Sequence, residues 1–152
     1  MNYQRSTRYA LYAAVEMASA PGGEAVTAAQ VAERYRLPPT VVAKVLQRLV
    51  KAGIAIGTRG VAGGYRLARP AGEIPLLEIV EVYEGPKPGS VCMLGECGEG
   101  QCGQFAECRL RQLFEEIDQQ ARATFASVTL ETLVAPRWPL ALVGLPAQRD
   151  AS

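Results

Sequence analysis

PTVVAKVLQRLVKAGIAIGTRGVAGGYRLAR, residues 39–69, is the stretch that decides the expected fold. Apolar residues recur in its first half at helical spacing, and Gly53 can end the helix that they predict from about Pro39 to Ala52. The face that we expect to be buried consists of Val42, Val45, Leu46 and Leu49. The opposite side is polar and basic, and it carries Thr40, Lys44, Gln47 and Lys51, with Arg48 at its margin. Such a face is typical of a helix that contacts DNA, although a solvated helix has a similar composition.

A β-hairpin is predicted directly after this helix. Residues 54–56 form a short apolar strand, residues 57–64 are rich in glycine, and residues 65–67 form the return strand. A hairpin in this position is the wing of a winged helix, and Arg59 lies in its loop, where a guanidinium can enter a minor groove. The other wing residues that we expect at DNA are Gly60, Gly63, Gly64 and Tyr65. A phosphate-binding nucleotide loop does not fit, because the pattern G-x-x-x-x-G-K-[ST] is absent and no helix follows.

Two helices are predicted upstream of this stretch. Thr7 can cap the first, which runs to about Ser19. Thr27 can cap the second, a short helix with a single apolar stripe. The stripe consists of Ala28, Val31, Ala32 and Tyr35. Residues 37–39 form a tight turn, because proline fixes φ and restricts the residue before it. Two short helices joined in this way are a helix-turn-helix, whose second helix lies in a DNA major groove.

Two further helices are predicted downstream of the hairpin. Pro75 can start one of them, whose apolar stripe consists of Leu76, Ile79, Val80 and Tyr83. A long helix is expected from just after Cys108 to about Ala126. Its apolar positions at helical spacing are Leu110, Leu113, Phe114, Ile117, Ala121 and Phe125. This stripe is larger than the core of a small domain needs, so we expect it to pair with a second copy of the chain. The alternative is that the stripe packs onto its own winged helix.

All four cysteines lie in one glycine-rich segment. Cys92, Cys97, Cys102 and Cys108 have the spacing C-x4-C-x4-C-x5-C, in a chain without histidine. Converging thiolates select zinc, copper(I) or an iron–sulfur cluster. Structural zinc sites usually use close C-x2-4-C pairs, so the looser spacing favours a cluster over zinc or a thiol switch. Disulfides need an oxidising compartment, and the N-terminal residues do not resemble a signal peptide. We therefore expect reduced cysteines in a cytoplasmic protein.

Charge is distributed unevenly along the chain. Of the 152 residues, 49 % are apolar and 20 % are charged, which is ordinary for a soluble protein. Residues 1–69 hold ten Lys/Arg against three Glu, a net charge of +7, whereas residues 70–152 hold six against twelve Asp/Glu, a net charge of −6. A basic half favours a polyanionic partner, and this half contains the predicted helix-turn-helix and wing. No apolar run is long enough to span a membrane.

Other classes of protein receive little support. An enzyme is not expected, because the chain has no histidine, no nucleophile beside a recognisable base and no nucleotide fingerprint. For the same reason we expect no small-molecule substrate. A small iron–sulfur electron carrier is a further alternative, but it would leave the basic winged helix without a purpose.

Four segments resemble, in order, the winged-helix iron–sulfur regulators typified by IscR and NsrR. They are AGIAIGTRGVAGGYRLARP at 52–70, EIPLLEIVEVYEGP at 73–86, the cysteine segment and SVTLETLV at 127–134. The wing motif R-G-x-x-G-G-Y-x-L-A-R at 59–69 is the most diagnostic. The similarity spans about residues 1–134. It implies a homodimeric transcription factor, a repressor, that binds double-stranded DNA under the control of a 2Fe-2S or 4Fe-4S cluster. Oxygen, nitric oxide or iron scarcity would act through that cluster.

The resemblance also implies a set of cluster ligands. Cys108, followed by Arg109 and Leu110, fits the last ligand of the family, and Cys97 and Cys102 fit the other two cysteines. Relatives take their fourth ligand from a histidine after the last cysteine or from a carboxylate of the partner's first helix. Arg111 and Arg8 stand at those two positions. Cys92 is then the expected fourth ligand, and the alternative is one of Glu96, Glu99 and Glu107.

The expected fold is mainly α with a small β-hairpin wing. A winged helix-turn-helix domain is predicted at residues 1–85, followed by a linker and cysteine-rich cluster-binding loop at 86–108. A dimerisation helix and end segment follow at 109–134. Residues 135–152 contain three prolines, which predict an irregular arm that is either disordered or strapped over an apolar groove.

Overall fold

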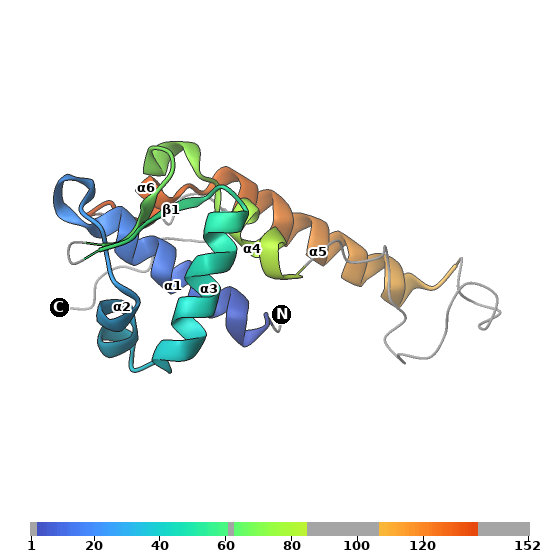
Figure 1. Ribbon diagram of the computed structural model, residues 1–152. Coiled ribbons are helices and arrows are strands. Elements are labelled where there is room, and N and C mark those ends of the chain that lie inside the picture. Colours follow the sequence, from blue (N-terminus) through green and yellow to red (C-terminus); the bar gives the residue numbers. More distant parts are fainter. Residues whose placement is uncertain (1–2, 61–62, 85–106, 137–152) are drawn as a thin grey trace, which may run out of the picture.

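A computed structural model describes residues 3–60, 63–84 and 107–136 of the chain (Figure 1). Its helices are α1 (Arg5–Ser19), α2 (Ala28–Tyr35), α3 (Pro39–Lys51), α4 (Leu76–Glu84), α5 (Arg109–Ser127) and α6 (Leu130–Val134). Short 3-10 turns lie at η1 (Pro21–Gly23) and η2 (Ala71–Glu73). Two strands, β1 (Ala55–Thr58) and β2 (Gly64–Leu67), form an antiparallel hairpin. The predicted class, mainly α with a small hairpin, is therefore confirmed. None of the helices in the described ranges is long and apolar enough to cross a membrane.

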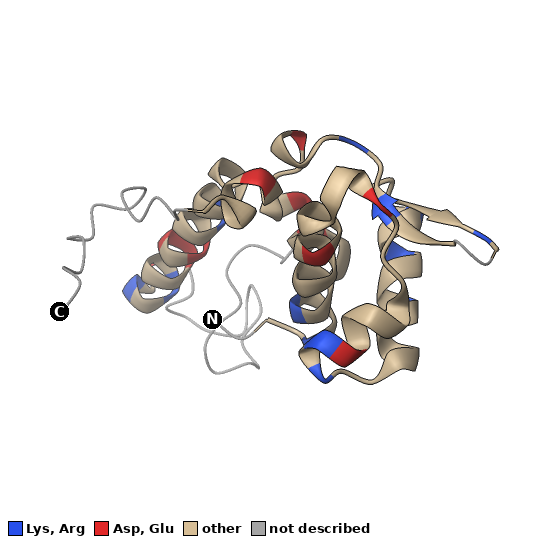
Figure 2. Ribbon diagram, turned by 90° about the vertical axis from the view of Figure 1, so that its left-hand side faces the viewer, with Lys and Arg blue, Asp and Glu red and all other residues tan. Residues whose placement is uncertain are grey.

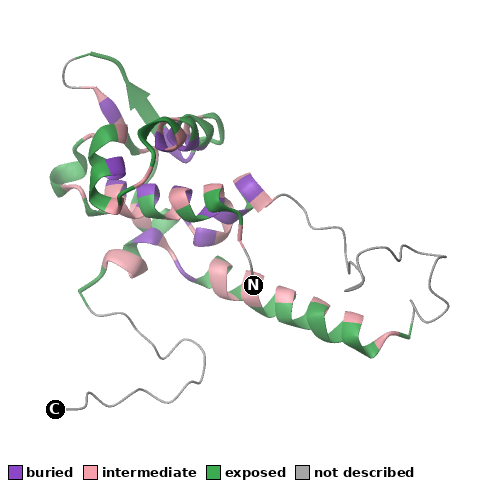
Figure 3. Ribbon diagram, turned by 90° about the horizontal axis from the view of Figure 1, so that it is seen from below, coloured by how far each residue is buried: buried purple, intermediate pink, exposed green. Residues whose placement is uncertain are grey.

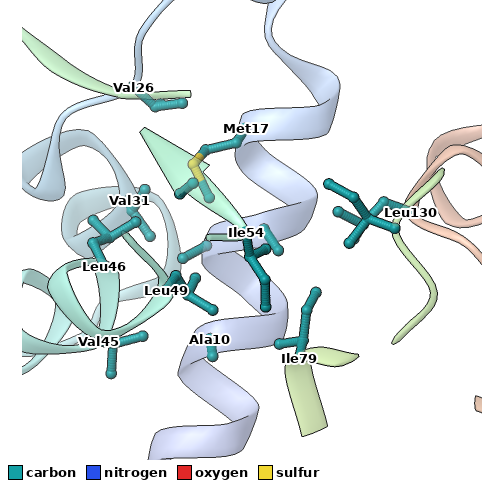
Figure 4. Packing of buried hydrophobic residues seen from close by; sticks show 14 of the residues in the cluster. Ala10, Met17, Val26, Val31, Val45, Leu46, Leu49, Ile54, Ile79 and Leu130 are labelled. Carbon is teal, nitrogen blue, oxygen red and sulfur yellow. The ribbon is translucent and has the colours of Figure 1, made fainter. Parts of the chain in front are cut away.

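The core is assembled around α1. This helix packs against α2, α3, α4, α6 and β2. Its buried residues are mostly small, namely Ala10, Ala13, Ala14 and Met17, with Thr7 also fully buried. Small side chains let several elements approach the same helix closely, and close approach gives the dense packing of a protein interior. Figure 4 shows side chains from α3, from α4 and from Leu130 converging on this helix.

The first helix begins earlier than its sequence signal suggests. Thr7 was expected at the cap, but α1 starts at Arg5, with Gln4 in the capping position. Thr7 lies inside the helix, where its Oγ1 donates a hydrogen bond of 2.5 Å to Oε1 of Glu84 on α4. A threonine near a helix start satisfies the local capping rule, but a tertiary partner 77 residues away accepts its hydroxyl instead.

The helix-turn-helix forms as predicted. Thr27 caps α2, since its Oγ1 accepts the backbone N–H of Gln30 while the Gln30 side chain accepts the N–H of Thr27. α2 ends at Arg36 in the left-handed region at φ 52°. α3 then starts at Pro39, and it buries all four residues of the predicted stripe, namely Val42, Val45, Leu46 and Leu49. The predicted stripe of α4 is likewise buried at all four positions.

The long helix α5 has a different relation to the rest. Figure 1 shows its N-terminal end projecting away from the other helices, while its C-terminal part lies along α4. Beyond α5 the chain returns to the core, where the Leu76 N–H donates to the Val128 carbonyl at 2.9 Å and the Leu130 N–H donates to the Ile74 carbonyl at 3.1 Å. Val128 and Leu130 are both buried. Residues near 130 therefore complete the core that residues 5–84 begin.

Candidate nucleic-acid interface

α3 presents the polar face that its sequence predicts. Thr40, Lys44, Gln47, Arg48 and Lys51 are all exposed, because the burial of the opposite stripe leaves them on the outer side of the helix. Lysine ammonium groups on such a face can contact phosphates, and a glutamine can bond to base edges. The geometry of α3 is therefore compatible with a recognition helix.

The wing is held in place by a third strand-like segment. Tyr65 and Val26 exchange two backbone hydrogen bonds of 2.8 Å each, which join β2 to the residue that precedes the capping residue of α2. Gly64 lies at this contact, and a Cβ at that position would stand only 2.9 Å from the Val26 carbonyl oxygen. The motif needs glycine at this position because two backbones meet there. Arg69, at the end of the same motif, binds the Glu78 carboxylate at 2.5 Å.

A groove separates α3 from the wing. Its volume is about 520 Å³, and it contains six of the ten predicted DNA-contacting residues. Those six are Gln47, Lys51, Arg59, Gly63, Gly64 and Tyr65. Thr40, Lys44, Arg48 and Gly60 do not line it. Thr27, Ala28, Val50, Gly57 and Thr58 also line the groove but were not among the predicted contacts. Thr27 was recognised only as a cap, and its place beside the wing depends on the pairing of Val26 with Tyr65, which leaves no local signal in the sequence.

Arg48 has a specific neighbour on another helix. Its guanidinium carbon lies 4.8 Å from the ring centroid of Tyr83, which is on α4. The hydroxyl of Tyr83 donates to the Val45 carbonyl of α3 at 2.8 Å. Burial raises the pKa of Tyr83 to about 12, although the Arg48 charge acts in the opposite direction. α3 is thus joined to the last turn of α4 by a hydrogen bond and a cation–π contact.

Basic and acidic residues are distributed differently over the helices and the hairpin. Figure 2 shows basic residues on the wing and on the helices beside it, whereas α5 carries acidic as well as basic segments. Acidic residues of α4 and α5 are partly neutralised by arginines, including pairs of Arg122 with Glu81 and of Arg111 with Glu115. Among the described residues, no carboxylate lines the groove between α3 and the wing. The groove therefore keeps its positive charge from Lys51 and Arg59.

The cysteine segment is only partly described. Cys92, Cys97 and Cys102 lie outside the described residues, as do the alternative ligands Glu96 and Glu99. Cys108 is a partly buried free thiol at the position that precedes α5. Arg111, at the position where the resemblance implied a histidine in relatives, pairs with Glu115 at 3.4 Å. Within residues 3–60, 63–84 and 107–136, no group of three or more metal-ligating side chains comes together. The predicted ligand set therefore stays a prediction.

The predicted dimerisation stripe divides into two parts. Leu110, Leu113, Phe114 and Ile117 are all exposed, and α5 has no fully buried residue (Figure 3). Ala121 and Phe125 are half-buried. Phe125 packs against the core of its own chain, and its ring meets that of Tyr3 edge to face at a centroid distance of 5.5 Å. One end of the stripe thus serves the chain's own core, which was the alternative reading, while the other end is open.

A helix-turn-helix with an exposed polar second helix, followed by a basic hairpin, defines a winged-helix DNA-binding protein. The chain belongs to the Rrf2 family, whose model is described as an iron-dependent transcriptional regulator and matches residues 3–136. The resemblance found in the sequence is therefore confirmed at the level of the family. By membership, the protein is a transcriptional regulator with a DNA-binding fold.

Individual relatives agree with this assignment. The chain is 32 % identical over 135 residues to BadM of Rhodopseudomonas palustris, named as an HTH-type transcriptional regulator, with 88 % of this chain and 81 % of BadM covered. The structure of CymR, described as the global cysteine regulator of B. subtilis, superimposes with a TM-score of 0.71 at 26 % identity. The match covers 88 % of this chain and 96 % of that CymR chain. The oxidized form of Staphylococcus aureus CymR has a TM-score of 0.69 at 25 % identity, with 88 % of this chain and 96 % of that chain covered. T. potens IscR shares the fold, with a TM-score of 0.68 at 22 % identity. The match covers 88 % of this chain and 86 % of the IscR chain.

Proposed function

We propose that the protein is a homodimeric repressor that binds operator DNA and senses cluster status, nitric oxide or redox stress through a cysteine-ligated iron–sulfur cluster. The observation that carries the DNA-binding part is the groove between α3 and the wing, into which Gln47, Lys51 and Arg59 converge. Such a repressor acts in the cytoplasm, beside the DNA it regulates. The family description as an iron-dependent regulator supports the choice of iron.

The two sides of the groove suit the two grooves of a DNA duplex. α3 would lie in the major groove, where Gln47 can bond to a base edge and Lys44 and Lys51 can meet phosphates. Arg59 would then reach the adjacent minor groove from the wing, because the hairpin stands beside α3 and carries Arg59 at its loop. DNA binding of this kind is both sequence-dependent and sensitive to salt.

The open end of the α5 stripe supports a dimer. Four large apolar side chains within eight residues of one helix are between 42 % and 60 % exposed. A second copy offers the same stripe, so that a two-fold interface can bury both. A two-fold dimer places its recognition helices about one DNA turn apart, roughly 34 Å, or a multiple of it. A small change in that spacing would alter the affinity for an operator strongly.

The donor set suits an iron–sulfur cluster. Cys92, Cys97, Cys102 and Cys108 would hold it, because thiolates are the ligands that such clusters prefer and no histidine competes. Cys108 stands directly before α5, so that a ligand there would connect to the proposed dimer helix. When bound, a cluster supplies an inorganic core that is sensitive to oxygen, nitric oxide and iron supply. The residues of this chain would hold it between the end of α4 and the start of α5.

Anaerobic purification followed by metal and sulfide analysis tests the proposal. We expect iron and acid-labile sulfide with a visible absorption spectrum, and a change in operator affinity when a chelator removes the iron. The operator would be a duplex selected from a random pool by the untreated protein. A colourless, iron-free protein that binds this duplex as tightly as before would contradict cluster sensing.

Two matched variants then assign the fourth ligand. Cys97→Ser removes a ligand that every version of the proposal requires, and it should abolish the cluster spectrum. Cys92→Ser should do the same if Cys92 completes the set. If its iron content and spectrum instead match those of the wild type while Cys97→Ser loses both, Cys92 is not a ligand and a carboxylate takes its place.

A thiol-switched or zinc-bound regulator is the second candidate. The structural similarity to CymR, which has been solved in a form titled as oxidized, favours it over an electron carrier. The same metal analysis separates the candidates. A thiol-switched protein contains no metal, and a zinc-bound protein contains zinc but no acid-labile sulfide. A thiol-switched protein would also change its operator affinity on mild oxidation in metal-free buffer.

A further inference from the structure

The last turn of α4 is a meeting point of three helices. Tyr83 and Glu84 end this helix, and the segment that contains Cys92, Cys97 and Cys102 follows them in the chain. Tyr83 contacts α3, whereas Glu84 contacts the first turn of α1. Both residues thus join the root of the cysteine segment to the DNA-binding module, although neither belongs to the groove between α3 and the wing.

Tyr83 holds α3 in two ways. Its hydroxyl donates to the Val45 carbonyl at 2.8 Å, and its ring lies 4.8 Å from the guanidinium carbon of Arg48, one helical turn further along. The residue is only 6 % exposed, so that the hydrogen bond is shielded from water. The hydroxyl is protonated at neutral pH, as in any tyrosine, and it is therefore available as a donor.

Arg48 can contact DNA while its guanidinium lies over the Tyr83 ring. A guanidinium has five N–H donors, and a cation–π contact with a ring leaves donors available for a phosphate. Arg48 is exposed and lies at the margin of the polar face of α3. The Tyr83 ring therefore determines the direction in which an arginine of the recognition helix points.

Glu84 fixes the same turn from the other side. Its carboxylate accepts the Gln4 backbone N–H at 2.9 Å and the Thr7 hydroxyl at 2.5 Å. Thr7 is fully buried, and the Gln4 side chain also donates to the Tyr83 carbonyl at 3.4 Å. Hydrogen bonds break over a displacement of less than an ångström, so that a shift of this turn cannot leave both α1 and α3 in place.

We propose that Tyr83 is a positioning residue for DNA binding, through which the C-terminal turn of α4 transmits the state of the adjoining cysteines to α3. This inference rests on the proposed sensing function and names the route by which it works. Tyr83 makes two contacts with α3, a hydrogen bond to the Val45 carbonyl and a cation–π contact with Arg48. The position of α3 therefore depends on the position of α4. No residue of the groove itself needs to change.

Three variants test the route in the full-length protein. Tyr83→Phe keeps the ring under Arg48 but removes the donor to Val45, whereas Tyr83→Leu removes both. Tyr35→Phe is the matched control. It also removes one tyrosine hydroxyl and its hydrogen bond, of 3.1 Å to Glu16, but that bond joins α2 to α1 and does not involve α4. For each protein, the affinity for the duplex selected by the wild type is measured before and after removal of the iron by a chelator.

The measured quantity is the ratio of the two affinities. Coupling between sites is typically 5- to 150-fold, so we expect a wild-type ratio of roughly tenfold or more. Tyr83→Leu should bring the ratio to within about twofold of one, Tyr83→Phe should give an intermediate ratio, and Tyr35→Phe should keep the wild-type ratio. Hydrogen exchange of the α3 amides in the metal-free protein gives a second readout, and it should be faster in Tyr83→Phe than in Tyr35→Phe.

The outcomes separate this inference from the function on which it rests. If removal of the iron changes the affinity of the wild type in either direction, and Tyr83→Phe and Tyr83→Leu keep the full ratio, the sensing function stands and the route through Tyr83 is wrong. If the wild type binds DNA equally with and without iron, the sensing function itself is overturned, and the route with it. Should Tyr83→Leu fail to fold, Tyr83→Phe decides, because it preserves the shape of the core.

Discussion

The winged-helix body and the outer half of α5, residues 109–117, have the same kind of sequence pattern but opposite environments. Leu46 and Leu49 of α3 are completely buried, whereas Leu110 and Leu113 of α5 are 60 % and 49 % exposed. All four are leucines at helical spacing. In the body, α1 and its neighbours cover the stripe, but no described element of the chain covers the outer half of α5.

The difference shows that helical periodicity identifies a face to be covered but not what covers it. The body folds around its own core, which draws on α1, α3, α4 and the residues near 130. Within residues 3–60, 63–84 and 107–136, no other element buries the outer half of α5, and we propose that a second copy of the chain does so. The proposed functions divide in the same way, since the proposed DNA-binding surface belongs to the body and the proposed dimer interface belongs to α5.

The largest expected effect comes from truncating a leucine of the body. Leu49→Ala should lower the free energy of unfolding by about 2 to 5 kcal/mol, because it leaves a cavity at a position with no exposed surface. Denaturant titration followed by circular dichroism measures the change. A loss well below 1 kcal/mol would contradict the closed core of the body.

The same substitution on α5 should act on assembly. Leu113→Ala should weaken the dimer by about 1 to 3 kcal/mol, or roughly 5- to 150-fold in the dissociation constant, because it removes apolar surface from the proposed interface. Sedimentation equilibrium at several concentrations measures this constant. Gln119→Ala, on the opposite side of α5, is the control and should leave the dimer unchanged. Equal effects of the two variants would remove the distinction between the body and the outer half of α5.

A third variant tests whether the surface of the body can be altered without its core. If Arg59 makes a groove-specific contact, Arg59→Ala should weaken operator binding by about 1 to 3 kcal/mol and relax the sequence preference. The free energy of unfolding should stay the same. Gel-shift titration measures the affinity. Arg34→Ala removes the same charge from the other side of α2, where Arg34 pairs with Glu16 at 3.0 Å, and it serves as the control. Unchanged binding by Arg59→Ala would reject the placement of the wing at DNA.

The smallest effect concerns the titratable group inside the body. Burial raises the pKa of Tyr83 to about 12 from an ordinary value of 10, and Arg48 is the charged group at its ring. Above pH 10 the unfolded chain loses this proton while the folded chain keeps it, so that stability falls as pH rises toward 12. The advantage of the wild type over Tyr83→Phe should therefore shrink by about 1 kcal/mol between pH 10 and pH 11.

Parallel unfolding titrations of the two proteins at those pH values measure this change. Tyr35, whose pKa is also raised by burial and by Glu16, is present in both proteins and cancels from the difference. A difference that stayed constant with pH would show that Tyr83 is not shielded in the folded chain.

Much of the fold could be predicted from local patterns. The capping residue Thr27, the start of α3 at Pro39 and the buried stripes of α3 and α4 were all predicted correctly, because each depends on residues within one or two helical turns. Thr7 was misplaced for the opposite reason, since its partner Glu84 is 77 residues away. The groove shows the same limit, because the neighbourhood of Thr27 and the wing depends on the pairing of Val26 with Tyr65.

The amino-acid sequence by itself determined the helices, the hairpin, the basic wing and the presence of four thiols in one segment, because spacing and residue type express these features locally. Only the tertiary structure decided which apolar stripe is covered, which residues meet in the groove, and that Arg48 lies over Tyr83. Those features depend on contacts between residues far apart in the chain, and their geometry exists only after the core around α1 has formed.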